Sequence, residues 1–78
     1  MNARTLDVGG LEPPEPMLRV LESLDTLAPN ERLRVLIDRE PLPLYSVLKR
    51  NGYSHCTTPL ENLRYAVLIW QEPDGLAT

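Results

Sequence analysis

Two proline-rich loops contain the charged and aromatic side chains that are the main candidates for a binding site. Residues 10–17 of the first loop read GLEPPEPM. Proline pre-sets the backbone of a first helical turn, and a glutamate there complements the partial positive charge of the helix N-terminus. This structural explanation covers most of the loop. The functional alternative is a rigid acidic lip, made by Glu12 and Glu15 with Pro13 and Pro14, that receives a cationic group of a partner.

The second loop, residues 37–45, reads IDREPLPLY and follows a predicted strand. Its structural interpretation is a solvated turn whose prolines stiffen the start of a helix. The functional alternative is a recognition loop in which Arg39, Glu40 and Tyr45 contact a ligand beside the acidic lip. Ligands of parallel α/β sheets sit beyond the carboxyl ends of the strands, and both loops are expected there. The expected position of both loops at the carboxyl ends of parallel strands is the main reason to predict a binding site there.

Cys56 and His55 are the other candidates for chemistry. The chain has one cysteine and one histidine, so it forms no internal disulfide, and a reducing cytoplasm suits it. Neighbouring residues of a strand point to opposite faces, which makes a catalytic Cys–His pair unsuitable here. Two ligands also fall short of the four of a structural zinc site. We expect a small, partly buried thiol and no cofactor; the alternative is haem or a metal ion bound through His55 or Cys56.

Hydrophobic periodicity predicts the elements that position these loops. Strands are predicted over residues 5–8, 32–38, 53–57 and 63–71, with helices over 17–27 and from 44 to a stop at Asn51-Gly52. The βαβαββ order predicts the α+β class: a two-layer α/β sandwich in which two helices cover one face of a four-stranded mixed sheet. We expect one domain over residues 1–78, with an ordered core of about 4–72 and a frayed tail.

Strand parity leaves the other face of the predicted sheet open. That face receives an apolar cluster of Leu36, Leu68 and Trp70, rimmed by arginines that include Arg34. One interpretation is ordinary surface apolarity, since more than half of any protein surface is apolar. The other is a docking or dimer surface, because Trp and Arg are enriched at interface centres.

Composition narrows the classes of partner. The net charge of −3 argues against a nucleic-acid binder, which needs a basic surface. The longest apolar run, residues 66–70, is far shorter than the ~20 residues of a membrane span. We therefore expect a protein partner, no nucleic acid and no membrane, and a monomer or weak dimer.

The chain resembles the TusA/SirA-like sulfur-carrier family through Leu6-Asp7, Gly10-Leu11 and Pro14-Glu15-Pro16. That family has the same βαβαββ order and a Cys-Pro-x-Pro motif at its first helix. The second half, with IDREPLPLYSVLKRNGYSH, resembles an uncharacterised branch of the superfamily, whose members occur alone or joined to hemerythrin-like and other redox modules. The position of the family's sulfur-carrying cysteine falls on Pro13.

This departure changes the function that the resemblance implies. A cysteine at a helix N-terminus has its thiolate favoured by the helix dipole and free N–H groups. Here Pro13, Pro14 and Pro16 remove three donors, and Glu12 and Glu15 repel anions. The resemblance therefore implies a non-enzymatic binding or adaptor domain that serves a redox or respiratory partner. The alternatives are a sensor for haem or a metal ion and a thiol or sulfur carrier through Cys56.

Overall fold

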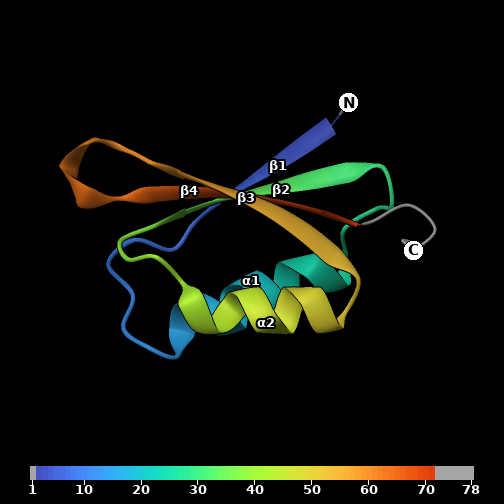
Figure 1. Ribbon diagram of the computed structural model, residues 1–78, viewed down its shortest axis with the longest axis horizontal. Coiled ribbons are helices and arrows are strands. Elements are labelled where there is room, and N and C mark those ends of the chain that lie inside the picture. Colours follow the sequence, from blue (N-terminus) through green and yellow to red (C-terminus); the bar gives the residue numbers. More distant parts are fainter. Residues whose placement is uncertain (1, 72–78) are drawn as a thin grey trace.

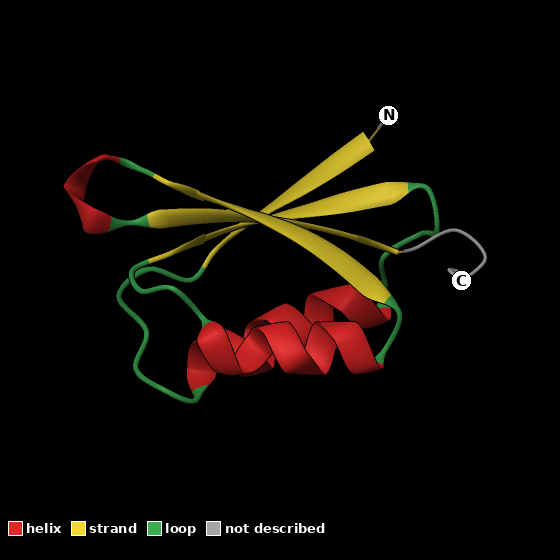
Figure 2. Cartoon of the chain, in the orientation of Figure 1, coloured by secondary structure: helices red, strands yellow, loops and turns green. Residues whose placement is uncertain are grey.

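The computed structural model of the chain describes residues 2–71. Its elements are β1 (Asn2–Asp7), α1 (Glu15–Asp25), β2 (Glu31–Ile37), α2 (Leu42–Arg50), β3 (Tyr53–Pro59), the short 3-10 helix η1 (Glu61–Leu63) and β4 (Tyr65–Gln71). The βαβαββ order and the two-layer sandwich are confirmed (Figure 1, Figure 2). The predicted core boundary at residue 72 and the tail beyond it lie outside the described residues.

The four strands form one mixed sheet in the order β1-β2-β4-β3. β1 runs parallel to β2 because α1 returns the chain to the same edge, while β4 runs antiparallel to both β2 and β3. Both helices lie on one face of this sheet, and no described element covers the other (Figure 2). Within the described part of the chain, neither helix is long and apolar enough to cross a bilayer.

The core lies between the helices and the sheet face that strand parity assigned to them. Its buried residues are Val8, Val20, Leu24, Leu27, Leu33, Val35, Ile37, Leu44, Leu48, Val67 and Ile69. The odd-numbered aliphatic residues of β2 and β4 all belong to this set and Tyr65 packs against it, so the predicted orientation of both central strands is confirmed. Each such side chain contributes roughly 1.5–3 kcal/mol by leaving water.

The prolines of both loops stand at helix starts. Pro14 is the N-cap of α1 and makes no side-chain cap, while Glu15 occupies the first turn and pairs with Arg19 at 3.4 Å. α2 also carries a proline in its first turn. It ends before Gly52, whose φ of +82° is the left-handed conformation that favours glycine. The structural interpretation of the prolines therefore fits both helices.

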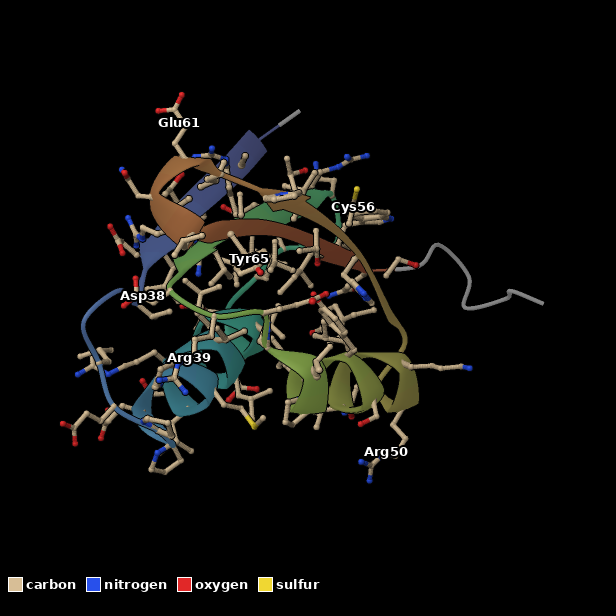
Figure 3. All side chains as sticks on the ribbon, turned by 60° about the vertical axis from the view of Figure 1, so that its left-hand side comes forward. Asp38, Arg39, Arg50, Cys56, Glu61 and Tyr65 are labelled. Atoms are coloured by element: carbon tan, nitrogen blue, oxygen red, sulfur yellow. The ribbon has the colours of Figure 1, made fainter. Side chains whose placement is uncertain are left out.

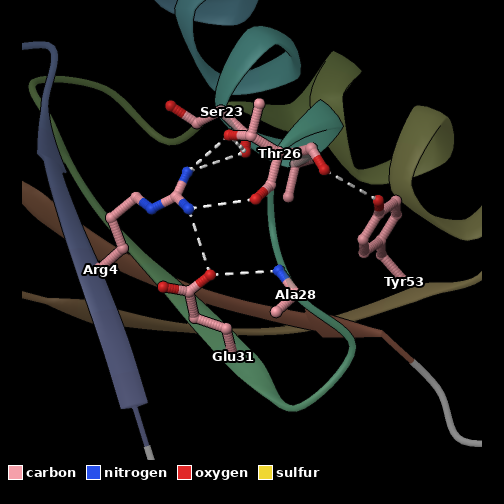
Figure 4. A network of polar contacts seen from close by, with 7 residues as sticks. Arg4, Ser23, Thr26, Ala28, Glu31 and Tyr53 are labelled. Carbon is pink, nitrogen blue, oxygen red and sulfur yellow. Dashed lines mark hydrogen bonds and ion pairs between the residues drawn. The ribbon is translucent and has the colours of Figure 1, made fainter.

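Arg4 joins β1 to the end of α1, a contact that sequence analysis did not reveal (Figure 4). Its guanidinium donates hydrogen bonds to the carbonyl of Ser23 at 3.3 Å, the hydroxyl of Thr26 at 2.8 Å and the carbonyl of Thr26 at 3.1 Å. It also pairs with Glu31 at 3.2 Å. A cation beside the last helical carbonyls complements the negative end of the helix dipole.

The tip of the β3–β4 hairpin has an unusual backbone. Asn62 and Leu63 have φ angles of 64° and 63°, and the side chain of Leu63 is 87% exposed. A left-handed conformation costs a residue with a β-carbon about 1–2 kcal/mol. This turn also delays β4, which begins at Tyr65 and not at the predicted residue 63.

Leu63→Gly is therefore expected to stabilise the protein by about 1 kcal/mol, because relief of the left-handed strain exceeds the added entropy of the unfolded chain. Urea denaturation measures this, and the midpoint of thermal unfolding should rise by roughly 4–8 °C. Leu18→Gly is the control, since Leu18 is also exposed (48%) but lies inside α1, where glycine costs about 1 kcal/mol. If both variants are destabilised alike, the turn is not strained.

Candidate functional site

The two proline loops enclose a cleft at the carboxyl ends of the parallel strands β1 and β2. Its volume is about 600 Å³, within the range of ligand sites. The apolar lining consists of Val8, Leu11, Met17, Val20, Ile37, Leu44 and the prolines 13, 14, 16, 41 and 43. Because proline holds its backbone at a nearly fixed angle, five prolines make this cleft largely pre-formed.

Most of the predicted loop residues do meet at this cleft. Glu12, Pro13 and Pro14 line it from the first loop, and Arg39 and Glu40 line it from the second. The expected juxtaposition of the two loops is therefore present in the fold. It follows from the parallel pairing of β1 and β2, which sends both loops out from one edge of the sheet.

Tyr45 and Glu15 lie elsewhere. Tyr45 points toward β3, where its ring stacks on His55 with 4.1 Å between ring centroids and its hydroxyl hydrogen-bonds to Thr57. The same hydroxyl donates to a carboxylate oxygen of Glu40 at 3.2 Å. Burial raises the pKa of Tyr45, so the phenol stays protonated. Tyr45 is therefore not among the lining residues of the cleft and is linked to them through its hydrogen bond to Glu40.

Arg64 braces the sheet edge next to the cleft, a contact that sequence analysis missed. Its guanidinium pairs with Asp7 at 2.8 Å and with Asp38 at 3.0 Å, the residues at the carboxyl ends of β1 and β2. Asp38 in turn accepts the N–H of Gly10 at 2.7 Å. Gly9 permits this close approach, because a β-carbon there would meet Arg64 at 2.5 Å. The first loop is thus fastened to the sheet edge.

The contacts of Arg64 also favour the charged forms of the groups that make them. The N–H of Gly9, and then Arg64, lower the pKa of Asp7 below its usual 3.8, and Asp7 raises the pKa of Arg64. The stabilisation from Asp7 is therefore present above pH 3.8 and is lost as the pH falls through the lowered value. Arg64 neutralises much of the Asp38 charge, which leaves Glu12, Glu40 and Arg39 as the charged rim of the cleft.

His55 and Cys56 do not form a joint site. His55 lies on the helix-facing side of β3, stacked on Tyr45, whereas Cys56 lies on the opposite face beside Leu68 (Figure 3). Cys56 is exposed, so the expectation of a partly buried thiol is wrong: β3 is an edge strand with no described element above it. Within residues 2–71, no three His, Cys, Asp or Glu residues gather as metal ligands.

The predicted cluster of the open face is assembled across β2 and β4. Arg34 is paired with Leu68, and Leu36 lies one pair further along. Leu36, Leu68 and Trp70 are half-buried. The guanidinium of Arg32 lies 5.0 Å from the centre of the Trp70 ring, a cation–π distance.

The chain was compared with known families, curated proteins and solved structures. A family model described as "Uncharacterized conserved protein (DUF2249)" matches residues 5–71, which include both proline loops and all of the core. No significant similarity to a curated protein or to a solved structure was found. The chain therefore belongs to the DUF2249 family of uncharacterised conserved proteins.

Proposed function

We propose that this protein is a non-enzymatic binding domain that holds a segment of a partner protein in the cleft between its proline loops. The cleft itself supports this proposal most directly, because it combines an apolar floor with a charged rim and is braced by Arg64. A pre-formed site loses little conformational entropy on binding.

The charged residues at the rim of the cleft determine which side chains a bound partner segment should carry. Glu12 and Glu40 supply two carboxylates against the single guanidinium of Arg39, so the cleft favours a segment with a Lys or Arg side chain next to an apolar one. A carboxylate and a guanidinium form a strong, charge-assisted hydrogen bond. Leu11 and Met17 offer the apolar contact, and Arg39 can pair with an acidic residue of the partner to set its orientation.

The composition of the cleft supports binding over sulfur transfer. Its lining residues include no thiol, the group that a sulfur carrier would use. We further propose that the fold is a TusA/SirA-like one in which Pro13 replaces the sulfur-carrying cysteine, and that the domain serves a redox or respiratory partner in the cytoplasm. The resemblance of the two proline loops to that superfamily supports this part of the proposal.

A titration with two matched peptides tests the binding proposal. The probes are acetyl-Lys-Leu-Arg-Leu-amide and acetyl-Glu-Leu-Glu-Leu-amide, added to the ¹⁵N-labelled protein at low salt. The basic peptide is expected to shift the amide signals of Gly10, Leu11 and Arg39, whereas the acidic peptide leaves them in place. Equal shifts by both peptides, or shifts confined to other residues, would contradict the proposal.

Charge-reversal variants test whether the basic peptide binds at the cleft. Replacing both Glu12 and Glu40 with Lys is expected to weaken binding of the basic peptide at least about tenfold, because each reversal turns an attraction into a repulsion. Glu61→Lys is the control of equal charge for each single reversal, Glu12→Lys and Glu40→Lys: Glu61 is exposed at the hairpin tip, away from the cleft (Figure 3). Equal weakening by the control would mean that net charge alone, and not the cleft, governs the binding.

A further inference from the structure

The open face of the sheet is a second surface, which meets the lining of the cleft at Asp38. The helices lie on the opposite side (Figure 1), and β2 and β4 present Leu36, Ala66, Leu68 and Trp70 here. Three of these side chains stay half-buried in the single chain, even though Arg32 covers part of the Trp70 ring. An apolar sheet face is most stable when another layer covers it.

The strand register separates the charges of this face into two ends. Arg32 and Arg34 lie where β2 begins, level with Trp70 and Leu68. Asp7 lies at the other end, level with Leu36, and Asp38 directly follows β2. Arg64 bridges these two carboxylates, which leaves that end with a net charge of −1 from these three groups. The face therefore has a basic end and an acidic end on β1 and β2, beside a row of apolar residues that runs along β4.

We propose that the open face is the interface of a symmetric homodimer, in which two copies pack face to face with their β2 strands in opposite directions. A two-fold axis in the interface, perpendicular to the strands, places the basic end of each copy over the acidic end of the other. The apolar rows on the two β4 strands then stack on each other. A second copy matches both ends at once, whereas an acidic partner would match only the arginine end.

The area of this face sets the strength of the dimer. Four strands about 4.8 Å apart, over some seven residues of about 3.3 Å, span roughly 450 Å² per copy. The buried total of roughly 900 Å² is below that of stable interfaces, so the dimer is weak and reversible, with a dissociation constant of about 10 µM to 1 mM. Because exposed charges contribute, salt is expected to weaken it.

Sedimentation analysis of the full chain across this concentration range tests the proposal. We expect the mass to double with increasing concentration in 50 mM salt and to fall back in 500 mM salt. The chain has one tryptophan, and it lies in the proposed interface, so its fluorescence should shift to the blue over the same range. A monomer at every concentration, or a dimer without a fluorescence shift, would overturn the proposal.

A charge reversal at the basic end identifies the face. Arg34→Glu is expected to weaken the dimer at least about tenfold, and the exposed position of Arg34 leaves folding intact, as thermal unfolding will verify. Arg50→Glu is the matched control, since Arg50 is exposed at the end of α2 in the helix layer (Figure 3). Equal loss in both variants would place the interface elsewhere. Arg34→Glu should leave the binding of the basic peptide at the cleft unchanged.

The single cysteine tests the direction of packing. With β2 strands reversed, β3 of one copy lies over β3 of the other, so the two exposed Cys56 side chains lie a few residues apart along the same pair of strands. A short bis-maleimide should therefore cross-link wild-type dimers and fail with Arg34→Glu at the same protein concentration. If the wild type dimerises but does not cross-link, the reversed arrangement is wrong.

Discussion

Leu33→Ala is expected to lower the free energy of unfolding by about 2–5 kcal/mol, through lost burial and the cavity left behind. Leu33 is fully buried in β2, a central strand paired on both sides. A chain of 78 residues has a total stability of only about 4–12 kcal/mol. The variant should therefore unfold at a midpoint some tens of degrees lower by calorimetry, since each kcal/mol corresponds to roughly 4–8 °C.

The matched control is Leu36→Ala on the same strand. Leu36 points to the open face and is half-buried, so its truncation should cost less than about 1.5 kcal/mol, as partial burial implies. Both variants are measured at low micromolar concentration, where the proposed dimer is dissociated. If Leu36→Ala is as destabilising as Leu33→Ala, then a further layer covers the open face in the single chain.

The contrast between these two leucines also shows why the fold could be predicted. Alternation along residues 32–38 assigns every second side chain to one face, and a strand has no other way to orient them. The hairpin tip could not be predicted in the same way. Leucine is an unusual residue for the left-handed backbone at position 63, so nothing in its identity indicates that β4 begins two residues later than expected.

The parts of the site that depend on local geometry could be predicted from the sequence. Both proline loops meet because two parallel strands end at one edge. The position of Tyr45 differs from the one expected beside the acidic lip, and helix geometry explains it: Leu44 is buried, and the next residue lies about 100° further around the helix, which turns Tyr45 toward β3. The Arg64 brace is different. It depends on the register of β4 against β2, which connects residues far apart in the chain and leaves no local pattern.

Exposure of the protein to a persulfide donor with its desulfurase is expected to add no stable sulfur atom, as mass spectrometry of the intact protein would show. Cys56 is the only thiol. It lies in the middle of an edge strand with its neighbour His55 on the other face, so the histidine is not placed beside it as the base that nucleophilic catalysis requires. A stable adduct that disappears in Cys56→Ser would contradict the proposed binding function.

A second variant tests whether this chain lacks only the sulfur-carrying cysteine, or also the surroundings that would make a cysteine at position 13 reactive. The chain with both Pro13→Cys and Cys56→Ser is also expected to gain no stable sulfur. The new thiol would precede the N-cap Pro14, outside the first turn where helix N–H groups favour a thiolate. The neighbouring Glu12 adds a repelling charge, and Pro14 and Pro16 donate no N–H. If this variant does accept one sulfur atom, the cleft has kept the environment of a carrier and lost only its cysteine. If no adduct forms, the proline loop differs from a sulfur-carrier site in its charge and its N–H donors as well as in the missing cysteine. Its negative charge then favours a cationic partner.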